Sequence, residues 1–189
     1  MKSIRHIILG GLLLAGICSP GRGQTLLNAG IGYFGEGITS PGVVLEFEWE
    51  KRFADDFSLP WRGDAGYFNN ADYHAFTIDL HKGFRKYWKS GLFVEQSLGA
   101  GIIAKSFKTD DYWYIDEFQN GIAHGNQMVW GFMPSVTLGA GYNLSKENRE
   151  ARLLWIRPKI FWDLGFRGLN LPYFALQAGY THTFKTKQP

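Results

Sequence analysis

Apolar and polar residues alternate in several stretches of this chain. The clearest stretch is 43–53, where large apolar residues occupy the odd positions as far as Trp49, and Glu46, Glu48 and Glu50 occupy even ones. Side chains of a β-strand alternate between two faces, so this stretch predicts a strand with one apolar and one charged face. Comparable stretches recur along the chain, and none keeps a helical period over a dozen residues.

Turn signals between these stretches divide the chain into eight predicted strands. They span 25–35, 42–53, 57–67, 72–85, 91–106, 127–143, 152–164 and 172–184. An even number of strands is typical of single-chain bacterial membrane barrels. The predicted fold is therefore all-β, an eight-stranded antiparallel up-and-down transmembrane β-barrel that follows an N-terminal signal peptide.

The connections between strands support this topology. With both ends of the barrel domain on the inner side, the first, third, fifth and seventh connections would face outward, and such loops are usually the longer ones. The predicted outer loops are 35–41, 68–71, 107–126 and 165–171, and the predicted inner turns are 54–56, 86–90 and 144–151. The third outer loop is clearly the longest.

The first residues predict an export signal. Lys2 and Arg5 precede an apolar run that ends at Ile17, and Gly23 suits a signal peptidase cleaving before Gln24. We therefore predict two parts, a signal peptide at 1–23 and an outer-membrane β-barrel at 24–189, in a Gram-negative bacterium. Cys18 raises lipoprotein processing as an alternative, although Ile17 stands where a lipid-attachment site usually has a small residue.

Charge and cysteine content exclude several classes of function. Lys2, Arg5 and Arg22 lie in the leader, and without them 17 of the 20 basic residues remain against 17 acidic ones. A neutral domain offers no field that attracts nucleic acid, so no nucleic-acid partner is expected. Without Cys18 the domain has no cysteine, which excludes disulfides and cysteine zinc sites.

Side-chain volume indicates which face of each strand points outward, because a lipocalin-like soluble barrel would have the opposite arrangement. One face carries bulky residues such as Phe47, Trp49, Ile78 and Phe174, too large together for the lumen of eight strands. The other face carries glycine, serine and threonine over 97–101, 135–141 and 177–181. We expect the bulky face to contact lipid and these glycines to relieve crowding in the lumen.

This orientation places charged residues inside the barrel. The predicted lumen charge network comprises Glu46, Glu48, Arg62, Asp64, Asp79, His81, Glu95, Arg157, Lys159 and Asp163. Isolated buried charges are costly, so we expect these groups to pair, with Arg157 and Lys159 facing the glutamates. The alternatives are a proton or ion path and a catalytic carboxylate pair.

Two further features concern the strands themselves. Pro60, Pro134 and Pro158 lie inside predicted strands, where each removes a donor, so we expect bulges or breaks there. Aromatic residues such as Phe34 and Tyr87 gather near strand ends, which favours the two membrane interfaces.

The whole mature chain resembles the small eight-stranded outer-membrane barrels of the OmpX, OmpA-barrel and OmpW type. The residues that carry the resemblance are the alternating strand 43–53 and the closing strand 173–184, which ends on Phe184. Such an ending resembles the signal read by the barrel-assembly machinery, although residues 185–189 follow it here. The resemblance implies fold and compartment, and no particular activity.

No motif for catalysis or cofactor binding stands out. A lipid A 3-O-deacylase places a histidine two residues before a serine, and none of His74, His81, His124 and His182 has that serine. A palmitoyltransferase-like barrel would begin with an amphipathic helix that is absent here. We expect no catalytic, cofactor-binding or metal-binding residues, no cofactor, and no enzymatic activity.

The longest loop is the best candidate for contact with a partner. The candidate interaction residues are Tyr112, Trp113, Tyr114, Ile115, Phe118 and His124. Rigid exposed rings provide contact area at low entropic cost. We therefore predict a non-enzymatic structural or interaction module in contact with outer-membrane lipid and, during biogenesis, with the barrel-assembly machinery. The alternatives are an accessory subunit of a larger outer-membrane complex and a narrow channel for small or apolar solutes.

Overall fold

The computed structural model describes residues 24–36, 40–54, 56–108, 113–116, 121–124, 128–145, 152–165 and 172–187. The strands are β1 (Gln24–Glu36), β2 (Gly42–Arg52), β3 (Phe57–Asn69), β4 (Tyr73–Tyr87), β5 (Leu92–Phe107), β6 (Trp113–Asp116), β7 (Gly121–His124), β8 (Val129–Asn143), β9 (Arg152–Trp162) and β10 (Pro172–Lys187). No helix among the described residues is long and apolar enough to cross a membrane.

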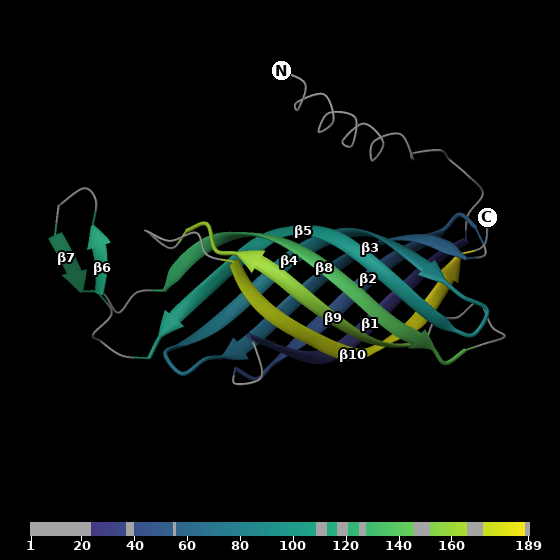
Figure 1. Cartoon of the computed structure of the whole chain (residues 1–189), viewed down its shortest axis with the longest axis horizontal. Coiled ribbons are helices and arrows are strands. Elements are labelled where there is room, and N and C mark those ends of the chain that lie inside the picture. Colours follow the sequence, from purple (N-terminus) through teal and green to yellow (C-terminus); the bar gives the residue numbers. More distant parts are fainter. Residues whose placement is uncertain are drawn as a thin grey trace, which may run out of the picture.

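Eight of these strands close into one antiparallel barrel, in the order β1-β10-β9-β8-β5-β4-β3-β2 (Figure 1). The predicted fold class is confirmed, and each predicted strand boundary lies within three residues of the observed one. The alternation of apolar and polar residues predicts the strand boundaries this closely because each strand of a membrane barrel needs one apolar and one polar face along its whole length. The pair β6–β7 was not predicted, and it forms a separate two-stranded sheet in the longest connection.

The two ends of the barrel differ in their connections. At the terminal end, where β1 begins and β10 ends, the connections are 53–56, 88–91 and 144–151. At the loop end they are 37–41, 70–72, 108–128 and 163–171, and Figure 1 shows the β6–β7 hairpin beyond the barrel at this end.

Gly91 has a φ of 92° in the tight turn between β4 and β5, a conformation that favours glycine. The predicted leader lies outside the described residues.

Large apolar side chains cover the outer wall of the barrel. Leu45, Phe47, Ile78, Leu98 and Phe174 each expose more than half of their surface. The alternate residues of the same strands are buried and mostly polar. The predicted orientation, apolar outward and polar inward, is confirmed. A wall of this kind is stable against acyl chains and not against water.

The interior also contains large aromatic residues, contrary to expectation. Phe34 and Tyr87, predicted at the membrane interfaces, point into the barrel and are buried. Phe34 packs edge-on against Phe68 at the loop end, with ring centroids 5.2 Å apart, and Tyr87 packs against Phe93 at the terminal end at 5.6 Å. Alternate residues of each strand face the lumen, and Phe34 and Tyr87 occupy such positions. This alternation fixes their direction, although both lie near a strand end.

Strand pairing is interrupted beside two of the three prolines. Between β3 and β4 the pairs run from Ser58 directly to Trp61, past Pro60. Between β8 and β9 the pairing likewise skips the position of Pro158. Pro134 stays in register with Ala100 on β5, whereas the pairing of β8 with β9 begins only at Ser135, the residue after it. A proline cannot donate to the ladder, which explains the two interruptions.

Candidate functional site

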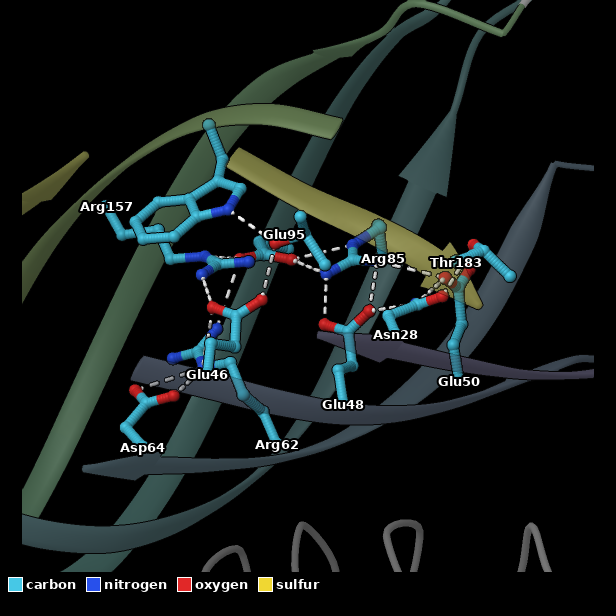
Figure 2. Close-up of polar contacts among 12 residues, drawn as sticks. Asn28, Glu46, Glu48, Glu50, Arg62, Asp64, Arg85, Glu95, Arg157 and Thr183 are labelled. Carbon is cyan, nitrogen blue, oxygen red and sulfur yellow. Dashed lines mark hydrogen bonds and ion pairs between the residues drawn. The ribbon is translucent and has the colours of Figure 1, made fainter. Parts of the chain in front are cut away.

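All ten residues of the predicted lumen charge network lie inside the barrel and are at most 6% exposed. They come from β2, β3, β4, β5 and β9, with Asp163 directly after β9. Figure 2 shows the middle of the lumen, where arginine and carboxylate side chains point toward one another from several strands. The residues in the middle of the lumen and those nearer the loop end differ in their contacts.

Glu95 on β5 is the common partner of three arginines. It binds Arg157 from β9, it lies 3.3 Å from Nη1 of Arg62, and its Oε2 accepts from Nε of Arg85 at 2.7 Å. Hydrogen bonds between two charged groups are the strongest that side chains form. Glu95 therefore ties β3, β4 and β9 together across the lumen.

Arg85 was not predicted as part of this network, yet it lies at its centre and is fully buried. Its Nη2 lies 2.6 Å from Glu48, and its Nη1 donates to Glu50 at 3.1 Å, in addition to its bond with Glu95. A guanidinium carries five donors in a fixed plane, so one arginine satisfies several carboxylates at once. Glu50, which shares the face of Glu46 and Glu48, also belongs to the network.

Polar residues extend the network across the seam between the first and last strands. Asn28 on β1 donates to Glu48 at 2.8 Å and accepts from Thr183 on β10 at 2.6 Å. Two residues earlier on β10, Thr181 donates to Glu46 at 2.8 Å and accepts from the indole of Trp155 at 2.7 Å. The closing seam of the barrel is thus held by side-chain bonds as well as by the backbone ladder.

A second group lies nearer the loop end. Asp79 binds His81 on the same strand, and Lys159 donates to Asp79 at 2.9 Å. The ring of Phe34 lies 5.5 Å from Nζ of Lys159, so the aromatic pair at the loop end begins directly beside this group. His81 also approaches Asp64 at 3.7 Å, which connects the group to the arginine network.

Asp64, Asp79 and His81 together have the chemistry of a metal site, since one ligand atom of each lies within 4.8 Å of the others. However, Nε of Arg62 lies 3.1 Å from Asp64, and Lys159 binds Asp79. A divalent cation would have to displace both. The group is better described as a set of ion pairs in which protein cations occupy the place of a metal.

The loop end contains a separate ion pair. Nζ of Lys105 lies 2.9 Å from Asp163, and 4.9 Å and 4.3 Å from the ring centroids of Tyr73 and Tyr173. Cations are attracted to aromatic faces, so the two rings stabilise the ammonium group. Together with Phe34 and its neighbours, this pair fills the lumen at the loop end.

Glycines make room for these side chains, as predicted. A Cβ atom at Gly139 on β8 would lie 2.7 Å from Cγ of Glu95 and 3.0 Å from Cγ of Arg157. Both distances are shorter than ordinary contacts, so any larger residue would displace the centre of the network.

Strand parity could have identified the residues that were missed. Arg85 and Lys105 stand at even spacing from Asp79 and Glu95 on their strands, so both point inward. Both lie inside the predicted strands 72–85 and 91–106, close to their ends, and were not included in the predicted network. Asn28 is uncharged, so a search for inward-facing charges does not find it, and only its place on the inner face of β1 indicates its role.

The candidate interaction residues are only partly placed. Trp113, Tyr114 and Ile115 lie on β6 and His124 ends β7, with Trp113 opposite His124 in the hairpin. Tyr112 and Phe118 lie outside the described residues. The four described residues of this set lie at the loop end, in β6 and β7.

The outer wall carries one shallow apolar hollow of about 770 Å³ near the terminal end, among the described residues. Its lining includes Trp88, Leu92, Ala140, Leu154 and Ile156, from β5, β8, β9 and the β4–β5 turn. The small side chain of Ala140 between larger ones explains the depression.

Comparisons with known proteins show the fold. No family model and no curated protein sequence matches the chain. It is similar to the crystal structure of Neisserial surface protein A, NspA, at 10% identity and a TM-score of 0.50, over 87% of this chain and 98% of that one. Two further similar structures have lower scores. They are Ail of Yersinia pestis (12% identity, TM-score 0.46, 86% and 99% covered) and the N-terminal barrel domain of Pseudomonas aeruginosa OprF (13%, 0.43, 85% and 99%).

The closed antiparallel sheet, its strand order and the likeness to NspA agree with one another. The chain therefore has the fold of the small eight-stranded outer-membrane β-barrels.

Proposed function

We propose that the protein is a non-enzymatic barrel of the outer membrane that supports the β6–β7 hairpin, with which it contacts a partner outside the cell. Residues 1–23 act as its cleaved export signal. The observation that carries the proposal is the contrast between a lumen filled with paired charges and rings and a long connection that contains its own two-stranded sheet.

The outer wall supports the membrane location. Its apolar side chains form a continuous band, and no aspartate or glutamate points outward from the barrel strands in the described part of the chain. A carboxylate in that position would have to be transferred into hydrocarbon. Outer-membrane lipid is thus the first partner of the protein, and the barrel-assembly machinery is the partner that its closing strand would meet during insertion.

The filled lumen argues against the channel alternative. The arginine network occupies the middle, and the pair Lys105–Asp163 with its aromatic neighbours occupies the loop end. Eight strands leave an interior just wide enough for side chains. Planar-bilayer recordings of the refolded protein should therefore show no steady unitary current, and a steady conductance would favour a channel instead.

The same lumen is a poor place for catalysis, because Asp79, His81 and Lys159 are at most 3% exposed and no outside substrate reaches them in this arrangement. The role of accessory subunit remains the alternative in which the wall, not the hairpin, meets a larger complex. Co-purification with a larger barrel in mild detergent, unaffected by loss of the hairpin, would favour it.

Photo-crosslinking in living cells tests the role of the hairpin. A benzoyl-phenylalanine placed at Tyr114 should give adducts of discrete mass, whereas the same group at Asp72, exposed in another connection at the same end, should give none. Adding Trp113→Ser and Ile115→Ser should reduce the Tyr114 adducts. Equal adducts at both positions, or none at Tyr114, would contradict the proposal.

A further inference from the structure

The outward-facing charges of the barrel are unevenly distributed. Among the strand residues whose side chains the structure describes, the lysines and arginines that point away from the lumen are Lys51 on β2, Lys82 and Lys86 on β4, and Arg152 on β9. All four lie in the half of the barrel next to the terminal end. The loop-end half of the wall has no outward lysine or arginine among these strands, so the wall presents positive charge at one membrane interface.

Three of these residues belong to one patch. Lys51 pairs with Leu59 on β3, and Lys82 pairs with Trp61 on the same strand. Lys86 pairs with Phe57, four residues from Trp61 toward the terminal end. Neighbouring strands lie about 4.8 Å apart and each residue advances about 3.3 Å along a strand, so the backbone of Lys51 lies roughly 12 Å from that of Lys82 and from that of Lys86, across β3. Lys82 and Lys86 are about 13 Å apart along β4. We call this group, with its aromatic neighbours, the basic wall patch.

Aromatic rings surround these lysines. Nζ of Lys82 lies 5.0 Å from the ring centroid of Trp61, and Nζ of Lys86 lies 4.7 Å from that of Phe57. Trp49 is the strand partner of Trp61, and both indoles are exposed on the wall. Tryptophan on a barrel wall marks the boundary between hydrocarbon and headgroups, so the lysines lie at the depth of lipid phosphates.

The lysines have no protein anion to neutralise them. The described residues include no ion pair to Lys51, Lys82 or Lys86, and the neighbouring glutamate, Glu50, points into the lumen. Asp56 in the adjacent turn is exposed, beyond the ends of β2 and β3. The patch therefore keeps a net positive charge, and its aromatic rings provide the apolar surface that acyl chains need.

We propose that the basic wall patch binds an anionic glycerophospholipid, with its phosphate held by Lys51, Lys82 and Lys86 and its acyl chains lying over Trp49 and Trp61. The proposal rests on the membrane location proposed above. Short turns are typical of the periplasmic end of such barrels, which places the patch in the inner, phospholipid leaflet. Lysines near an anionic membrane surface provide the electrostatic attraction, and the rings provide the contact.

Native mass spectrometry of the full refolded chain in detergent micelles tests this proposal. Phosphatidylglycerol, phosphatidylcholine with the same acyl chains, and lipopolysaccharide are titrated separately. The wild type should retain phosphatidylglycerol in preference to phosphatidylcholine. Changing all three lysines to glutamine should weaken that binding about 100-fold, because each lysine contributes roughly fivefold near an anionic surface.

Two matched variants separate the patch from charge in general. Arg152→Gln removes an outward charge at the same end but on β9, and it should change binding by less than about twofold. A Lys51→Arg, Lys82→Arg, Lys86→Arg variant keeps the charge and should retain binding. Heat-modified migration on gels shows independently whether each variant is a folded barrel. If the triple glutamine variant does not fold, the Lys51→Gln, Lys86→Gln double variant should still lose about 25-fold.

The proposal is overturned if the triple glutamine variant binds phosphatidylglycerol as the wild type does, or if phosphatidylcholine binds equally well. Preference for lipopolysaccharide over phosphatidylglycerol overturns the choice of lipid and leaflet. A chain that inserts into vesicles without any lipid preference keeps the proposed membrane location and refutes only the patch, so the two proposals fail separately.

Discussion

The middle of the lumen and its loop end neutralise buried charge in different ways. In the middle, Glu95 contacts three arginines, and Arg85 contacts three carboxylates. At the loop end, Lys105 lies against Asp163 and two tyrosine rings. In the middle of the lumen, each charged group contacts partners from several strands, whereas at the loop end one lysine faces one aspartate. A shared network holds several strands in register, whereas a pair closes one part of the barrel.

The largest effect is expected for Arg85→Ala. The change leaves Glu48, Glu50 and Glu95 without a common cation, so the free energy of unfolding should fall by about 5 kcal/mol, the upper end for breaking a buried ion pair. Urea unfolding in lipid vesicles, followed by tryptophan fluorescence, measures it. Arg52→Ala is the control, because Arg52 is 17% exposed at the edge of the network and should lose about 1 kcal/mol or less. A loss no larger than that of the control would show that Arg85 is not central.

Arg157→Ala should have a smaller effect, about 3 kcal/mol, the lower end of the same range. Arg62 remains 3.9 Å from Glu46 and 3.3 Å from Glu95, and Glu95 also keeps Arg85, so neither carboxylate loses its last cation. Removing Arg62 and Arg157 together should therefore exceed the sum of the single losses, because the two share partners. An unchanged melting profile of the Arg157→Ala variant in detergent would show that Arg157 does not stabilise the barrel through this network.

Lys105→Met tests whether the loop end behaves as a pair. It leaves Asp163 buried without its ammonium partner, which should cost about 3 kcal/mol in the same unfolding experiment, the lower end for breaking a buried ion pair. Adding Asp163→Asn removes the stranded charge and should restore at least half of that loss. Failure of the second change to restore stability would indicate a network here too, and the contrast with the middle would disappear.

The smallest effect is expected for the hairpin. Replacing residues 109–127 by a Gly-Ser segment of equal length should leave the free energy of unfolding within about 0.5 kcal/mol, as for surface changes elsewhere. β6 pairs with β7 and forms a sheet distinct from the barrel. A loss of several kcal/mol would mean that the hairpin packs on the rim and stabilises the barrel.

Alternation along the chain was sufficient to predict the eight barrel strands and the inward direction of the ten charged residues assigned to the lumen. Glu46, Arg62 and Arg157 are buried, as predicted. Their direction could be predicted because the face on which a strand residue lies follows from the alternation of its immediate neighbours. The same rule places Phe34 and Tyr87 inside, but their location near strand ends favoured an interfacial interpretation. Local pattern was the better guide at these two positions.

The partners within the lumen could not be predicted in this way. That Arg85 meets Glu48 and Glu50, and that Lys159 meets Asp79, depends on the stagger between strands and on which strands face one another across the barrel. Stagger is set by closure of the whole sheet, which no single stretch of sequence contains. The β6–β7 hairpin was missed for another reason, since strands of four residues are too short to show a period.

Side chains that bridge the seam also bear on how the barrel enters the bilayer. Thr183 and Thr181 on the last strand hydrogen-bond Asn28 and Glu46 near the beginning of the chain. Before β10 meets β1, these partners are separated, and the inner face of an open sheet would expose its carboxylates and guanidinium groups to hydrocarbon. Insertion and ring closure should therefore occur as one cooperative event, with half-inserted sheets too unstable to accumulate.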